Sequence, residues 1–222
     1  MSGWLLLLGF AAGLGALITG PLADTGFVNW DENYPVDLEA ARTSTGESWS
    51  QVGSGMGETL TVVGVAVAIG IVFLIARRWA SALLLATALL AEVSVFVVTT
   101  ILIPRDRPDV EQLDVSPPTS SFPSGHTAAA TALALTLALL VGWNTRSMVA
   151  RWLAWVLAVL VGPVVAFSRV YRGMHHPTDV VVGLVIGAAC ATLAFFAVRA
   201  WVGSSGNRDG VRGSHSIEET VR

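Results

Sequence analysis

Six long apolar segments divide this chain of 222 residues, and they restrict its fold more than any other feature. Each is close to the roughly 20 residues that an α-helix needs to cross a bilayer. The chain is 53% hydrophobic and 13% charged, whereas about a quarter of the residues in a soluble domain are charged. We therefore predict an all-α polytopic membrane protein, with six transmembrane helices in a bundle within residues 1–202. The predicted spans are 3–20, 58–76, 79–103, 123–143, 150–168 and 178–200.

The polar segments complete this prediction. Residues 21–57 form an acidic outer loop between the first two spans, and a solvated connector is a better reading of it than a lid. Residues 203–222 are polar and rich in Gly and Ser, so we expect a disordered cytoplasmic tail. The first span lacks a basic flank, which favours a membrane anchor over a cleaved signal peptide.

The distribution of arginine predicts an orientation. All thirteen basic residues are Arg, and a cytoplasmic N-terminus would put eight of them inside and five outside. The loops that join the third to the fourth span and the fifth to the sixth then lie together on the outer face of the plasma membrane. The net charge of −3 and the lack of a basic stripe argue against nucleic-acid binding.

The pentapeptide Phe122-Pro123-Ser124-Gly125-His126 opens the fourth span. Proline suits a helix start, and Ser124 can cap the first turn. Gly125 allows another group to approach the backbone, and the free N–H groups of a helix start attract anions. His126 can exchange a proton near neutral pH. Taken alone, these residues fit a helix cap with an interfacial histidine equally well.

The two outer loops add side chains suited to phosphate chemistry. Arg107 and Arg169 offer planar sets of N–H donors that match phosphate oxygens, and Ser124 and the backbone at Gly125 add further donors. We predict that these groups hold a phosphoryl group. Neither a metal nor another cofactor is needed for this arrangement, and the single cysteine, Cys190, excludes a thiolate cluster.

A candidate nucleophile follows in the second loop. Asp179 comes four residues after His175, near a helix start, so its carboxylate can bond one ring nitrogen and leave the other free to attack phosphorus. His126 can protonate the departing oxygen. More modest roles suit the neighbours, with Arg172 in an ion pair or at headgroups, His176 structural, and Ser168 bonded either to backbone or to substrate. Glu92, inside the third span, is expected to make a structural hydrogen bond rather than to form a proton route.

Two of these motifs together resemble the type 2 phosphatidic acid phosphatase superfamily. Pro123-Ser124-Gly125-His126 matches one part of its signature, and Ser168-Arg169 followed by His175 and Asp179 at the family spacing matches another. The remaining part is a lysine followed after six residues by Arg-Pro. Arg107-Pro108 is present, but Thr100 stands at the lysine position. The resemblance extends over roughly residues 55–200.

The resemblance implies a metal-independent phosphatase that acts through a phosphohistidine at His175, with Asp179 orienting the ring and His126 as general acid. Arg107, Ser124, Gly125 and Arg169 would form the phosphate cradle, and Arg105 would partly replace the missing lysine. The predicted substrate is a membrane lipid phosphate, with a polyprenyl diphosphate favoured over phosphatidic acid and phosphatidylglycerol phosphate. The alternatives are a lipid-linked phosphotransferase and a catalytically silent protein that binds or transports phospholipid. The sequence leaves the oligomeric state open.

Overall fold

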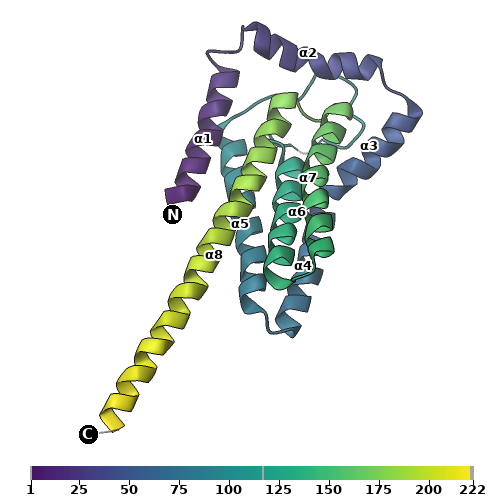
Figure 1. Cartoon of the computed structure of the whole chain (residues 1–222). Coiled ribbons are helices and arrows are strands. Elements are labelled where there is room, and N and C mark those ends of the chain that lie inside the picture. The colour runs from purple at the N-terminus through teal and green to yellow at the C-terminus, as the bar shows by residue number, and fades with distance from the viewer. Residues whose placement is uncertain (1, 117, 221–222) are drawn as a thin grey trace.

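The computed structural model describes residues 2–116 and 118–220, and within these residues it contains eight α-helices and no strand (Figure 1). This confirms the all-α prediction. The helices are α1 (Ser2–Thr19), α2 (Gly26–Ala40), α3 (Ser44–Met56), α4 (Thr59–Ile75), α5 (Trp79–Leu102), α6 (Gly125–Asn144), α7 (Met148–Tyr171) and α8 (Pro177–Thr220).

Four helices, α5 to α8, are long and apolar enough to cross a membrane. The bent pair α3 and α4, which meet at 45°, could form a fifth span, whereas α1 is apolar but short. Six spans are therefore not confirmed, and the described residues support four or five. The physical reason is length, because the 18 residues of α1 and the 17 of α4 rise only about 26 Å each, less than the roughly 30 Å hydrocarbon core.

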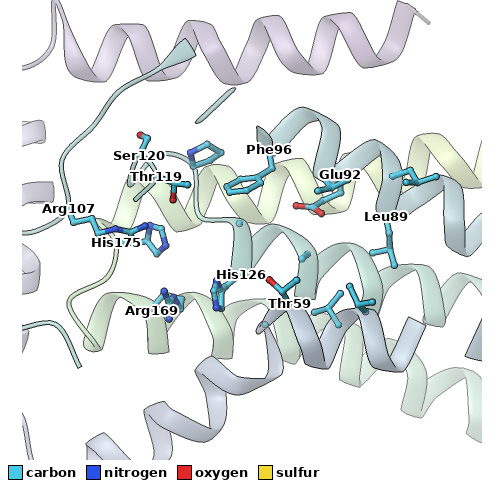
Figure 2. A pocket seen from close by; sticks show the side chains of 18 residues that line it. Thr59, Leu89, Glu92, Phe96, Arg107, Thr119, Ser120, His126, Arg169 and His175 are labelled. Atoms are coloured by element: carbon cyan, nitrogen blue, oxygen red, sulfur yellow. The ribbon is translucent and has the colours of Figure 1, made fainter. Parts of the chain in front are cut away.

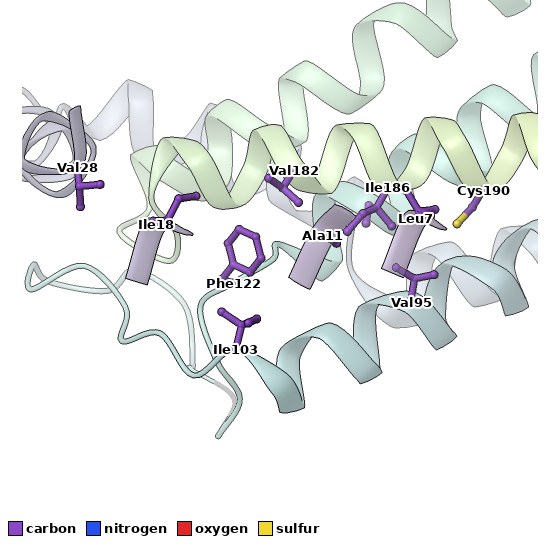
Figure 3. Packing of buried hydrophobic residues seen from close by; sticks show 11 residues of the cluster. Leu7, Ala11, Ile18, Val28, Val95, Ile103, Phe122, Val182, Ile186 and Cys190 are labelled. Atoms are coloured by element: carbon purple, nitrogen blue, oxygen red, sulfur yellow. The ribbon is translucent and has the colours of Figure 1, made fainter. Parts of the chain in front are cut away.

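The bundle is organised around α6, which packs against α5, α7 and α8 (Figure 1). Near the start of α6, a buried cluster gathers side chains from α1, α5 and α8 around Phe122, which has no exposed surface (Figure 3). Ile103 and Val182 are among its neighbours in the cluster. Phe122 therefore anchors the loop that leads into the Pro-Ser-Gly-His motif.

Close contact between α6 and α8 depends on two glycines. A Cβ atom on Gly183 would lie 2.7 Å from the carbonyl oxygen of Ser124, and one on Gly187 would collide with the carbonyl oxygen of Ala128. The other pair spaced by four, Gly9 and Gly13, has nothing within 4 Å of the corresponding positions. Of these two pairs, therefore, the one on α8 supports close helix packing and the one on α1 does not.

Residues 21–57 form two helices rather than the solvated connector expected from their acidic composition. Figure 1 shows α2 lying across the end of the bundle that holds the α5–α6 and α7–α8 connections, and α3 descending beside α7. Asp31 on α2 has no exposed surface, and its buried carboxylate is compensated by an ion pair with the buried side chain of Arg105. On α3, Gly53 lets the Ser168 hydroxyl of α7 approach the backbone closely.

The backbone of α8 continues as a helix to Thr220, through the segment for which the composition predicts disorder. In Figure 1 this end of α8 extends away from the other helices. The glycines of residues 203–220 lower the helix propensity of this stretch of the sequence.

Candidate active site

A cavity of about 440 Å³ lies at the end of the bundle covered by α2 and α3, and it has two chemically different ends (Figure 2). The polar end is lined by Arg107, His126, Arg169 and His175, with Thr119 and Ser120 beside them. The other end runs down between α4 and α5 and is mainly apolar, with Val62, Val63, Leu89, Leu90, Val93 and Phe96. The structure thus brings residues of the α5–α6 and α7–α8 connections to one cavity, as the sequence predicts.

His175 is buried, and its ring orientation is set by a backbone carbonyl. Its Nδ1 lies 2.8 Å from the carbonyl oxygen of Ser121, which can only accept a hydrogen bond, so Nδ1 carries the proton and Nε2 keeps its lone pair. Asp179 Oδ2 is 3.7 Å from Nδ1, which is too long for a hydrogen bond but close enough to attract a positive ring. The direct bond expected between His175 and Asp179 is therefore replaced by the Ser121 carbonyl.

The charge state of His175 follows from its surroundings. Burial lowers the pKa of His175 to about 4, and the guanidinium groups of Arg169 and Arg107 act in the same direction. The Asp179 carboxylate opposes them by favouring the protonated ring. At neutral pH the ring is consequently neutral, which is the form a nucleophile requires.

Asp179 is fully buried at the first turn of α8, and several donors hold it. Arg105 Nη1 donates to Oδ1 at 2.6 Å, while the Ser121 hydroxyl and the His176 backbone N–H donate to Oδ2 at 2.5 and 2.9 Å. Ser121 therefore contacts both His175 and Asp179, the first through its carbonyl and the second through its side chain. The structural role expected for His176 agrees with these contacts.

Arg105 belongs to the network behind His175. Its Nη2 donates to Asp31 Oδ2 at 2.7 Å, and its Nη1 donates to Thr178 as well as to Asp179. Burial alone would lower the pKa of Arg105, but the carboxylates of Asp179 and Asp31 outweigh it and raise the pKa. Arg105 is not among the described residues that line the cavity. Its guanidinium therefore lies apart from the position expected for a phosphate ligand.

Arg107 and Arg169 line the polar end of the cavity and have donors left over. Arg107 donates from Nη1 to the Met174 carbonyl at 2.6 Å, and Arg169 donates from Nη1 to Ser54 and Asp114 at 2.8 and 2.7 Å. The Nε–H of each arginine is buried without a hydrogen-bond partner among the described residues. A buried donor left unpaired costs about 1–3 kcal/mol, which an anion in the cavity would offset.

A second ion-pair group fixes Arg169 from the side of α3. Asp114 accepts hydrogen bonds from Arg172 Nε and Nη2 at 2.9 and 2.7 Å. Burial would raise the pKa of Asp114, but its bonds to Arg172 and the nearby charge of Arg169 lower it overall. Arg172 thus forms the expected ion pair, and the Ser168 hydroxyl bonds backbone, donating to the Val164 carbonyl at 2.8 Å.

The Pro-Ser-Gly-His motif mainly positions the start of α6. The Ser124 hydroxyl is fully buried and pairs with Thr127 Oγ1 at 3.0 Å, while the Ser124 backbone N–H donates to the Asp179 carbonyl at 3.0 Å. Gly125 packs against Phe96, whose ring would lie 2.8 Å from an added Cβ. Gly125 and His126 line the cavity, and Ser124 acts behind it.

Two residues of this network, Ser121 and Asp31, were not predicted from the sequence. Ser121 stands just before the Pro-Ser-Gly-His motif, but a backbone carbonyl leaves no signal in one sequence. Asp31 is one of several acidic residues in residues 21–57, and only its burial distinguishes it. Within the part of the chain that the structure describes, no group of three or more His, Cys, Asp or Glu side chains could hold a metal ion.

Comparison with solved structures supports the fold. The crystal structure of a transmembrane PAP2-type phosphatidylglycerolphosphate phosphatase from Bacillus subtilis superimposes with a TM-score of 0.75. The match covers 92% of this chain and 98% of that one at 24% sequence identity, and at this identity it shows a shared fold alone.

Curated relatives and a family model extend the comparison. The decaprenylphosphoryl-5-phosphoribose phosphatase of Mycobacterium tuberculosis is 34% identical over 95 residues, covering 41% of this chain and 47% of that protein. The undecaprenyl-diphosphatase of Sulfolobus acidocaldarius is 34% identical over 76 residues, covering 34% of this chain and 32% of that protein. The model of the PAP2 superfamily matches residues 79–202, which is more than half of the sequence and includes α5, α6, α7 and the apolar part of α8. The chain belongs to the PAP2 superfamily.

Proposed function

We propose that this protein is an integral-membrane phosphatase that hydrolyses a lipid phosphate or diphosphate through a phosphohistidine. The observation that carries this proposal is a cavity lined by Arg107, Arg169, His126 and His175, in which both arginines also have a buried Nε–H without a partner among the described residues. Two unpaired cationic donors beside a neutral imidazole suit a bound anion that is attacked by nitrogen.

The reaction proceeds in two steps. His175 Nε2 attacks phosphorus, the bond from phosphorus to the lipid oxygen breaks, and His126 gives that oxygen a proton. His126, now neutral, takes a proton from a water molecule, which attacks the phosphohistidine and releases inorganic phosphate. Arg107 and Arg169 stabilise the charge that develops on the phosphoryl oxygens. The Ser121 carbonyl holds the His175 ring in the required tautomer, and Asp179 stabilises the positive charge on the substituted ring.

The substrate is a lipid of the bilayer, and the site acts on the outer face of the plasma membrane. The apolar lower end of the cavity supports a lipid leaving group, because its walls are aliphatic and aromatic side chains of α4 and α5. The named relatives act on polyprenyl-linked phosphates, which agrees with the prediction of a polyprenyl diphosphate. Phosphatidic acid and phosphatidylglycerol phosphate are the alternative substrates.

The test is phosphate release by the purified full chain in detergent from these three lipids, with EDTA present throughout. We expect turnover of at least one lipid, loss of turnover in His175→Ala, and accumulation of acid-labile, protein-bound phosphate when hydrolysis is slowed in His126→Ala. Release that requires an added divalent cation would contradict metal independence. Unchanged release in His175→Ala would contradict the mechanism.

A further inference from the structure

A carboxyl group that the proposed mechanism does not use lies in the same cavity. Glu92, on α5, has 4% of its surface exposed and lines the cavity among Leu89, Leu90, Val93 and Phe96 (Figure 2). Among the described residues no side chain or backbone group forms a hydrogen bond or ion pair with it, so the structural bond expected from the sequence is not formed. A polar group in such surroundings is costly unless a partner arrives with the ligand.

The position of Glu92 relates it to the leaving group. Phe96 packs on Gly125 at the start of α6, and Glu92 precedes Phe96 by one helical turn, about 6 Å along α5. In phosphoryl transfer the attacking and leaving atoms lie roughly in line through phosphorus. Figure 2 shows His175 at one end of the cavity and Glu92 toward the other, with His126 between them in this view. The leaving group, which departs from phosphorus on the side opposite His175, therefore extends toward Glu92.

The chemistry of a carboxyl group selects what it can meet there. A hydroxyl can donate to a carboxylate and can also exchange donor and acceptor roles with a carboxylic acid, so it pairs with either protonation state. A purely hydrocarbon leaving group leaves Glu92 without a partner.

We propose that Glu92 is a specificity-determining residue that hydrogen-bonds a free hydroxyl on the leaving group, a few atoms from the scissile phosphate. The preferred substrates are then lipid phosphates whose leaving group carries a free hydroxyl close to the scissile bond, as in glycerol or a sugar, in preference to an unsubstituted alkyl phosphate. This inference rests on the proposed function, because it assumes that the phosphoryl group lies at the polar end of the cavity.

The test uses two lipids that differ by one oxygen atom. 1-Acyl-glycerol 3-phosphate carries a free 2-hydroxyl, and its 2-deoxy counterpart has the same acyl chain and phosphate. We expect wild-type kcat/KM to favour the hydroxylated lipid by about tenfold or more. In Glu92→Leu the ratio should fall to about one, because the hydrogen bond is lost, and Glu92→Gln should retain most of it, because an amide also donates and accepts. Leu89→Met, which changes the cavity wall without changing its polarity, should keep the wild-type ratio.

Two results would overturn the inference, a wild-type ratio near one and a ratio that Glu92→Leu leaves unchanged. An equal loss on both lipids in Glu92→Leu would likewise overturn it, since that pattern indicates a structural role. Failure of the proposed function is recognised separately, as wild-type protein that hydrolyses neither these two lipids nor any of the three lipids of the phosphate-release assay. In that case the affinities of the two corresponding phosphonates, which cannot be cleaved, decide the matter, and equal binding to wild type would overturn the role of Glu92.

Discussion

The polar groups behind the His175 ring and those in front of it differ in how fully they are paired. Behind the ring, Arg105 bonds both Asp31 and Asp179, and Ser121 bonds both Asp179 and His175. In front, the Nε–H groups of Arg107 and Arg169 have no partner among the described residues. Arg105 and Arg107 are two residues apart in sequence, yet one is satisfied by the protein and the other retains a donor for a ligand. Pairing, more than residue type, thus separates scaffold from binding site.

The largest effect is expected at the boundary between the two regions. His175→Ala should lower kcat by about 10⁴-fold or more, because it removes the proposed nucleophile. The adjacent His176, which bonds Asp179 from behind, supplies the matched control. His176→Ala keeps its backbone N–H and should lose far less activity in the same phosphate-release assay. Similar losses of activity in the two variants would contradict the proposed difference in role between His175 and His176.

Arginine substitutions on the two sides should separate activity from stability. Arg107→Met should lower kcat/KM about 10²–10³-fold, as expected for removal of one donor to the developing charge, with a small change in Tm. Arg105→Met should destabilise the fold by about 3–5 kcal/mol, because it leaves the buried carboxylates of Asp31 and Asp179 uncompensated. Thermal unfolding in detergent together with phosphate release measures both quantities. If Arg107→Met proved the less stable variant, the division into paired and unpaired sides would be wrong.

The ion pair from α2 should be coupled to Arg105. Asp31→Asn should destabilise the protein by about 1–3 kcal/mol, because Asp31 accepts from both Arg105 and the Thr178 backbone without exposure to water. The double variant Asp31→Asn, Arg105→Met should lose less unfolding free energy than the sum of the losses in the two single variants, as is usual for residues in contact. Asp37→Asn, on the same helix, is a control for which we expect little change in Tm. Strict additivity of the double variant would argue against the coupling.

The smallest effect concerns pH. The pKa of His175 is lowered to about 4, so the ring is already neutral well below its ordinary titration range. Because the neutral ring is the proposed nucleophile, kcat/KM should change by less than about twofold on account of this group between pH 5 and 7, and should fall as the pH drops through about 4. A pH profile of kcat/KM in EDTA measures this. The prediction would be contradicted by an acid limb centred near pH 6.5 that persists when each of the other histidines is substituted. Such a limb would belong to His175 and would show that its pKa is not lowered in the free enzyme.

The chemistry of the site was easier to predict than its supports. The motif around Ser124 and the spacing of Arg169, His175 and Asp179 correctly indicated one family and two loops that meet, because these residues carry their chemistry in their side chains. The carbonyl of Ser121 could not be predicted, since every residue has one and only the folded path shows which is used. Asp31 was hidden because its pairing with Arg105 depends on how α2 lies across the bundle. The count of six spans was not confirmed, because apolar character at α1 and α4 does not guarantee membrane-spanning length.

The contact of Gly183 and Gly187 with α6 links distant parts of the chain. Ser124, at the start of α6, and Asp179, at the start of α8, are joined by a backbone hydrogen bond just above this crossing. A single methyl group at Gly187 would force the two helices apart and separate the loops that lead into them, which together bring His126 and His175 to one cavity. A mutational scan should therefore find intolerant positions within the hydrocarbon depth that touch no substrate, where loss of function arises from misalignment.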